Sequence, residues 1–239
     1  MGKRIGIFAL GILLGSLLNN FISWWPKQHK DSPVPQAVCP HCGHPWRGLE
    51  TIALWGRVFG EGRCQYCGDH VPLRYLLVEL AAGILLVLAY SRAQSPLDMM
   101  RLGIFVLLLI PLFFIDLKHH RLPNVLTLPG MVLGLLLSAG LGQIKSAVLG
   151  ALAGGGLLCA AAVITRGGIG VGDAKLQAMV GAFLGLRRMF ASLAVGVVLG
   201  GIVGLILLAL RLKGRRDVVP YGPFLITGAL LVSLLFQTG

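Results

Sequence analysis

Apolar stretches long enough to cross a bilayer follow one another along most of this 239-residue chain. A membrane-spanning helix needs about 20 mostly apolar residues. After residue 75, only short polar or Gly/Pro-containing interruptions separate the stretches. The chain is therefore predicted to be an all-α polytopic membrane protein.

The composition supports this prediction. Only 13% of the residues are charged, 56% are hydrophobic, and the mean hydropathy is +0.82, whereas a soluble domain carries about 25% charged residues. The membrane also explains the formal net charge of +12, because cytoplasmic loops collect Lys and Arg. No nucleic-acid partner is therefore expected.

The polar interruptions divide the chain into eight predicted transmembrane helices. The first, within residues 1–26, ends at Trp24 and Trp25 rather than at the small residues of a signal cleavage site, so it is expected to be retained. Residues 27–74 form a polar segment long enough for an extramembrane domain, and residues 75–239 supply the other seven helices. The interruptions in this last region fall at residues 91–96, 118–123, 140–145, 166–173, 185–188 and 211–220.

The basic residues indicate the orientation. With the 27–74 domain in the cytoplasm, 14 of the 21 Lys and Arg residues lie in or beside cytoplasmic loops, and this two-to-one bias favours a cytoplasmic cysteine domain with an external N-terminus. The other seven are Lys3, Arg4, Arg92, Arg101, Lys145, Arg187 and Arg188.

Four of the five cysteines form two pairs in the polar domain, Cys39/Cys42 and Cys64/Cys67. Two C-x2-C pairs, each followed by a glycine that permits a tight turn, can supply four thiolates to one tetrahedral metal. We therefore predict a structural zinc site with no open position for catalysis. Disulfides or redox chemistry are the alternative, which a reducing cytoplasm disfavours. Cys159, inside an apolar stretch, is expected to be a small buried hydrophobe.

Two aspartates stand at the ends of apolar stretches in a region where acidic residues are rare. Asp116 follows the stretch 105–115, and Asp173 ends a glycine-rich segment and opens another stretch. Two predicted helices separate them, and an even number of crossings returns the chain to the same face, so the carboxylates can meet. An ionisable group at membrane depth is costly without a partner or a function. Two close carboxylates would share a proton, as aspartyl proteolysis requires.

Each aspartate also has a structural alternative. Asp173 could cap a helix that starts at Ala174, and Asp116 could face lipid headgroups beside Lys118 and Arg121. Neither alternative explains why both aspartates lie on one face beside a glycine-rich segment. The sequence leaves open which aspartate is the base.

These features resemble a known family, the bacterial type IV prepilin peptidases, which are membrane aspartyl proteases of the GxGD type. The resemblance covers nearly the whole chain and rests on six motifs in family order. They are Gly15–Asn19, the two C-x2-C pairs, Arg74–Glu79, Ile115–Asn124, Gly170–Lys175 and Pro220–Leu225.

The resemblance implies that Asp116 and Asp173 are the catalytic pair. The partner would be a membrane-embedded type IV prepilin or pseudopilin, whose leader is removed at the cytoplasmic face. Many members also methylate the new N-terminus with S-adenosyl-L-methionine, so a second activity is implied. The resemblance also implies structural or site-supporting roles for Glu79, Gly170, Gly172, Lys175, Pro220 and Gly222.

Alternative functions remain. Between Cys42 and Cys64 the chain departs from the Asn-Ile-Pro type segment of many members, which leaves a peptidase without methylation as one alternative. A zinc-stabilised assembly scaffold or a transporter is another. Transporter sites lie near the bilayer midplane, whereas these aspartates are predicted at one edge.

Glycines recur at four-residue spacing along the predicted helices. Such spacing lets helix backbones approach closely in lipid. We expect close packing within the chain, and a homo-oligomer is not indicated. The pairs are Gly11/Gly15, Gly130/Gly134, Gly150/Gly154, Gly181/Gly185 and Gly196/Gly200.

Overall fold

Seven helices make up the described part of the chain in the computed structural model. The described residues are 2–25, 39, 42–44, 52, 63–64, 66–70, 72–165, 170–210 and 221–235. The chain divides into two units, Met1–Ser91 and Arg92–Gly239. The helices are α1 (Gly2–Trp24), α3 (Leu73–Arg92), α4 (Pro96–His119), α5 (Asn124–Gly140), α6 (Ile144–Ile164), α7 (Val171–Ala209) and α8 (Gly222–Leu235).

Five of the described helices, α1, α3, α4, α6 and α7, are long and apolar enough to cross a membrane. Helices α5 and α8 are also apolar but shorter, with 17 and 14 residues. The all-helical fold agrees with the sequence-based prediction. The predicted number of eight crossings stays a prediction.

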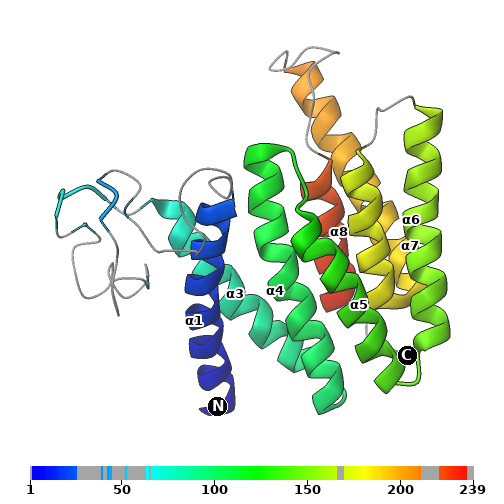
Figure 1. The fold of residues 1–239 in the computed structure, drawn as a ribbon, viewed down its shortest axis with the longest axis horizontal. Helices are drawn as coiled ribbons and strands as arrows, with labels where there is room; N and C mark the ends of the chain where they lie inside the picture. Colours follow the sequence, from blue (N-terminus) through cyan, green and yellow to red (C-terminus); the bar gives the residue numbers. More distant parts are fainter. Residues whose placement is uncertain are drawn as a thin grey trace. The chain divides into compact units, whose positions relative to one another are not determined.

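Helix α7 is not one straight helix. Gly185 has φ 77° and ψ 175°, a conformation that favours glycine and interrupts the helix. The Gln177 Nε2 donates to the Met189 carbonyl at 3.3 Å and to Ser192 Oγ at 3.4 Å. In a straight helix, residues 177 and 192 would be about 22 Å apart. The second half of α7 therefore folds back along the first (Figure 1), and the break lies within the interruption predicted at 185–188.

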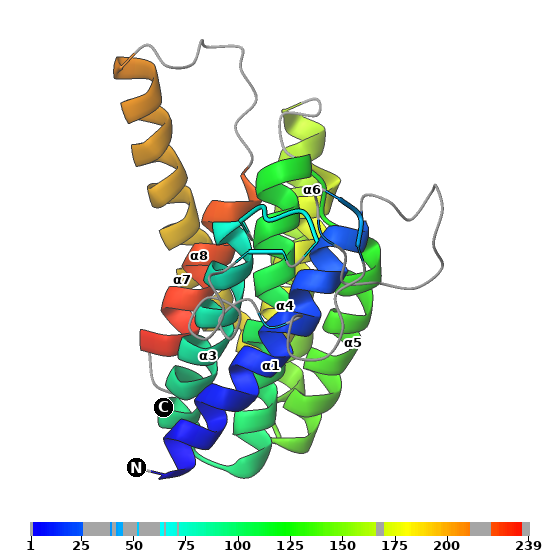
Figure 2. The same cartoon turned by 90° about the vertical axis from the view of Figure 1, so that its left-hand side faces the viewer.

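The helices of the second unit pack around α7. Helix α7 contacts α5, α6 and α8, and α4 contacts α5 and α8. Figure 2 shows α8 beside the second half of α7. Phe105 of α4 and Phe183 of α7 are buried, and their ring centroids lie 4.9 Å apart. This apolar core fixes the ends of α4, α7 and α8 relative to one another.

Glycines lie where helices of the same unit approach most closely. A Cβ placed on Gly181 of α7 would overlap the backbone of Gly150 on α6. In the first unit, a Cβ on Gly11 of α1 would overlap the backbone of Gly83 on α3. These contacts join helices of one chain, as the four-residue spacing predicts.

The fifth cysteine differs from the expectation. Cys159 on α6 is exposed, so the prediction of a buried residue was wrong. Successive residues of a helix point about 100° apart, and Leu158 is the buried neighbour. The Cys159 side chain therefore lies on the outer face of α6.

Candidate active site and metal centre

Both aspartates lie at the same end of the second unit. Asp116 is in the last turn of α4 and Asp173 is in the first turn of α7. Their exposed fractions are only 6% and 9%. The C-terminal end of α4 and the first residues of α7 and α8 meet here (Figure 1). The structure therefore brings together two carboxylates that 56 residues of sequence separate.

Gly222, the first residue of α8, lies between the two carboxylates. A Cβ placed on it would overlap Asp116 Oδ2 and would lie 3.5 Å from Asp173 Oδ1. The Gly222 backbone N–H donates a hydrogen bond to Asp116, and the two aspartates interact electrostatically. Only a residue without a Cβ leaves the space between the carboxylates open.

Asp173 also supports the start of its helix. Helix α7 begins at Val171 with Gly170 as the preceding N-cap residue, so Asp173 is its third residue. Its carboxylate accepts the Gly170 backbone N–H, and its own N–H donates to the Gly170 carbonyl at 3.0 Å. This resembles a capping box, in which the third residue reaches back to the N-cap. The prediction that this helix starts at Ala174 was therefore wrong. The Asp173 carboxylate makes this capping contact in addition to its electrostatic interaction with Asp116.

The structural alternative for Asp116 was wrong. With an exposed fraction of 6%, this carboxylate does not face lipid headgroups. It points into the protein, where Gly222 donates to it. The chain turns sharply just beyond it, because His120 ends α4 with φ 51° and donates its N–H to the Asp116 carbonyl at 2.8 Å. The His120 side chain also interacts electrostatically with Asp116.

Two contacts hold the start of α7 against the α4–α5 connection. A Cβ on Gly172 would lie 3.3 Å from the Leu122 Cβ, so the backbone of α7 approaches this connection closely. Lys175 Nζ donates to Asn124 Oδ1 at 2.9 Å. Lys175 thus ties the helix that carries Asp173 to the first residue of α5.

The sequence did not single out Tyr221. It is half-buried and interacts electrostatically with Asp173. In the sequence, only its position directly before Gly222 could have indicated that Tyr221 lies near the aspartates.

Two other residues predicted to support the site are not placed beside the aspartates. Pro220 lies outside the described residues. Glu79 is buried in the first unit, where the α3 backbone at Glu79 packs against Gly15.

The two cysteine pairs in the first unit form the same turn twice. In each turn the first cysteine donates its N–H at 2.8 Å to the carbonyl five residues later, in His44 or Asp69. The backbone N–H of the following glycine, Gly43 or Gly68, donates to the carbonyl of the first cysteine at 2.9 Å. Gly43 and Gly68 have φ 72° and 73°, which favours glycine. Each turn therefore presents its two thiols in the same way.

The four thiols converge on one point. All four Sγ atoms lie within 4.8 Å of one another, and the Cys39–Cys67 and Cys42–Cys64 pairs are each 3.8 Å apart. A tetrahedral ion with metal–sulfur bonds of about 2.3 Å holds its sulfurs about 3.8 Å apart, so the donor set fits a metal. Disulfide sulfurs are about 2.05 Å apart. The Cys67 and Tyr66 backbone N–H groups lower the pKa of the Cys64 thiol to about 6, whereas burial and the neighbouring thiols raise the pKa of Cys42 and Cys67. Without a metal, the thiolate is therefore favoured at Cys64 and opposed at these two cysteines.

Comparisons with known proteins identify the class of protein. The sequence profile of the type IV leader peptidase family matches residues 103–205, which include both aspartates. The profile of the bacterial peptidase A24 N-terminal domain matches residues 9–93, which include the four paired cysteines. The chain therefore has the two parts of a bacterial leader peptidase. It belongs to the type IV leader peptidase family, which confirms the resemblance seen in the sequence.

Three relatives show the extent of the similarity, and each is named prepilin leader peptidase/N-methyltransferase. The one from Aeromonas hydrophila is 32% identical over 92% of this chain and 86% of its own length. The one from Bacillus subtilis (strain 168) is 29% identical over 95% of this chain and 92% of its own. The one from Myxococcus xanthus (strain DK1622) is 35% identical over 84% of this chain, which spans only 62% of that relative. No solved structure matches the chain.

Proposed function

We propose that this chain is a membrane aspartyl endopeptidase that removes the leader of type IV prepilins or pseudopilins. The observation that carries the proposal is the position of two buried carboxylates, Asp116 and Asp173, around Gly222. The family match and the names of the relatives support the choice of substrate.

The proposed reaction uses one proton shared between the two carboxylates. The ionised carboxylate takes a proton from a water molecule, whose oxygen attacks the scissile carbonyl carbon. The protonated carboxylate donates a hydrogen bond to the carbonyl oxygen and then gives its proton to the leaving amine nitrogen. The C–N bond breaks, which leaves a carboxylate on the leader and a free amine on the pilin.

The residues around the pair would position the carboxylates and the substrate. Gly222 leaves room between them, and Gly170 and Gly172 place no side chain on the backbone at two of the three positions before Asp173. Lys175 holds the start of α7 through Asn124. We propose supporting roles for Pro220 and, from the first unit, for Glu79.

The proposed setting is the bacterial inner membrane, with eight crossings and with the metal domain and the active site on the cytoplasmic side. The distribution of basic residues supports this orientation, and the break in α7 at Gly185 supports counting its two halves separately. A prepilin helix in the bilayer can diffuse sideways to this end, where its leader junction meets both carboxylates and water.

The test of the proposal is to incubate the purified chain with a prepilin and measure the mass of the pilin N-terminus. We expect loss of the leader without any added cofactor. We also propose N-methylation as a second activity, because the relatives carry that name, with S-adenosyl-L-methionine as the methyl donor. With this donor present, the product should gain about 14 Da, the mass of one added CH₂ unit. An intact prepilin would contradict the proposal. A cleaved but unmethylated product would mean that the chain has the peptidase activity without the methyltransferase activity.

The metal is proposed to be zinc, held by all four paired cysteines in a closed, structural site. Zinc would cross-link the two cysteine turns and so stabilise the small domain around them. It would take no part in proteolysis, because four thiolates leave no open coordination position.

Replacing Cys64 by Ser is expected to remove the metal. The purified wild-type protein should contain about one zinc per chain, and C64S should contain less than about a tenth of that, because three thiolates hold the ion much more weakly. Elemental analysis by mass spectrometry gives the ratio. The matched control is C159S, which removes an exposed thiol from α6 and should keep its zinc. Full zinc in C64S, or iron in place of zinc, would contradict the proposal.

A further inference from the structure

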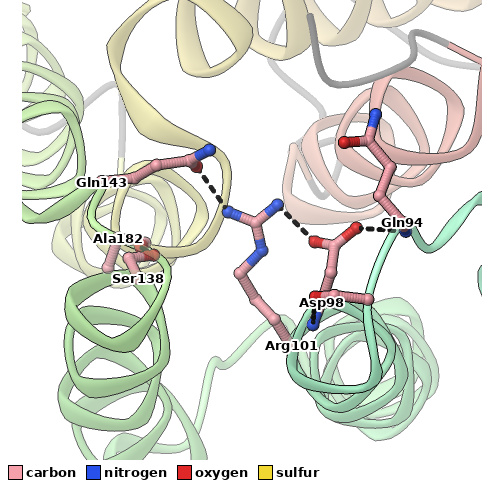
Figure 3. Close-up of polar contacts among 7 residues, drawn as sticks. Gln94, Asp98, Arg101, Ser138, Gln143 and Ala182 are labelled. Carbon is pink, nitrogen blue, oxygen red and sulfur yellow. Dashed lines mark hydrogen bonds and ion pairs between the residues drawn. The ribbon is translucent and has the colours of Figure 1, made fainter.

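The opposite end of the second unit contains a buried cluster of charged groups (Figure 3). Asp98 and Arg101 are only 4% and 2% exposed, and Arg101 Nη2 lies 2.7 Å from Asp98 Oδ1. Arg101 Nη1 donates to Gln143 Oε1 at 2.9 Å. The other Asp98 oxygen accepts the Gln94 N–H at 3.1 Å. These contacts tie the start of α4 to the turn between α5 and α6.

The cluster has an unpaired donor. Arg101 Nε is buried and has no hydrogen-bond partner among the described residues. A buried polar group without a partner destabilises the folded state, and more strongly when it is charged. An acceptor that reached this nitrogen would complete its hydrogen bonding.

The cluster also has more positive than negative charge. Arg188, in the turn that follows Gly185, interacts electrostatically with both Arg101 and Asp98. It is half-buried and forms no hydrogen bond or ion pair with another described residue. One carboxylate thus faces two guanidinium groups. A bound anion would balance the second guanidinium.

Two exposed basic side chains flank the cluster. The Leu186 N–H donates to Ser146 Oγ at 3.2 Å, so the turn after Gly185 lies against the first turn of α6. Arg187 and Lys145 are the sequence neighbours of these two residues, and both are exposed. Asp98 is the only acidic residue in the three segments that meet here, residues 92–101, 141–148 and 184–190. These three segments together therefore carry a net positive charge.

The position of the cluster identifies the anion. Residues 98 and 116 of α4 are about 27 Å apart at 1.5 Å per residue, which is close to the hydrocarbon thickness of about 30 Å. When Asp116 lies at one membrane surface, Asp98 and Arg101 lie at the other. The anions present at that level are lipid phosphates, whose oxygens accept charge-assisted hydrogen bonds from guanidinium groups.

We propose that this end of the second unit binds the phosphate of an anionic phospholipid, in the leaflet opposite the aspartates. A phosphate oxygen between Arg188 and Arg101 supplies the missing charge and an acceptor for Arg101 Nε. Arg187 and Lys145 contact the exposed side of the headgroup. Asp98 and Gln143 hold Arg101 in place and prevent its side chain from moving out to water.

The test uses the purified full-length protein in a neutral detergent. Phosphatidylglycerol at 100 times its Kd is expected to raise the midpoint of thermal unfolding by about 5 °C. Phosphatidylcholine, whose headgroup is neutral overall, and soluble glycerol 3-phosphate are expected to leave it unchanged. Equal stabilisation by both lipids would overturn the proposal. Stabilisation by glycerol 3-phosphate would also overturn it, because the site would then take a free phosphate ester.

Variants locate the site. Native mass spectrometry of R188Q should show phosphatidylglycerol bound about tenfold more weakly, the effect of losing one charge-assisted hydrogen bond. The control R121Q removes an exposed arginine beyond the other end of α4 and should bind like the wild type. R188Q also alters the charge balance around the buried Asp98, so a second variant is needed. The double variant K145Q/R187Q removes only exposed charged groups and should weaken binding about threefold. Equal losses in R121Q and R188Q would contradict the proposed location.

Discussion

Asp116→Asn and Asp173→Asn are each expected to reduce the rate of leader removal by at least about 10³-fold, because each variant removes one of the two proton-transfer groups. The reaction needs a carboxylate that accepts a proton from water and a second that donates one to the leaving nitrogen. An amide can do neither. The measurement is the cleavage rate of a purified prepilin, followed by the mass of the pilin N-terminus.

The same variants are expected to keep the fold. Asn has nearly the volume of Asp, and an amide oxygen at position 173 can still accept the Gly170 backbone N–H that supports the start of α7. Thermal unfolding and zinc content should stay close to the wild type. Wild-type cleavage by either variant would rule out an aspartyl mechanism. A dead variant that still supports pilus assembly from pre-cleaved pilin would point to a second role as a scaffold.

Gly222→Ala is expected to reduce cleavage by at least about 10²-fold without unfolding the protein. The added Cβ would overlap Asp116 Oδ2 and would lie 2.9 Å from Asp116 Cγ, so the carboxylate must move. A displacement of about 1 Å at a reacting group costs about 10²-fold in rate. The prepilin cleavage assay measures the loss.

The fold and the reaction should respond differently to this substitution. Gly222 is the first residue of α8 and does not have a positive φ, so alanine can adopt its backbone conformation and thermal stability should not fall much. The matched control is Gly201→Ala on α7, where nothing lies within 4 Å of the added Cβ. G201A should cleave normally. Equal activity in both variants would mean that Gly222 does not limit the space between the carboxylates.

The sequence predicted the parts of the fold that depend on local composition. Hydropathy located the helices, and two intervening helices placed Asp116 and Asp173 on the same face. The C-x2-C-Gly spacing predicted the paired turns, because their hydrogen bonds lie within five residues. These features need only short-range rules of periodicity and turn geometry.

Features that depend on packing between distant helices could not be predicted. The interruption at 185–188 marked a break, but the contact of Gln177 with Ser192 shows that the chain reverses there. Arg101 was counted among the basic residues of one face, and its burial depends on Gln143 from another turn. Gly222 was assigned only a supporting role from its motif, because its position between the aspartates results from the packing of α8.

Helix α4 carries a charged pair near its start and the proposed catalytic carboxylate, Asp116, near its end, so a fixed length of helix separates them. If the Asp98–Arg101 end is held at one lipid surface, the thickness of the bilayer sets the depth of Asp116. In a thicker membrane the carboxylate would sink below the surface that water reaches, and in a thinner one it would rise out of it. The lipid composition of the host membrane would thus adjust how fast pilins mature.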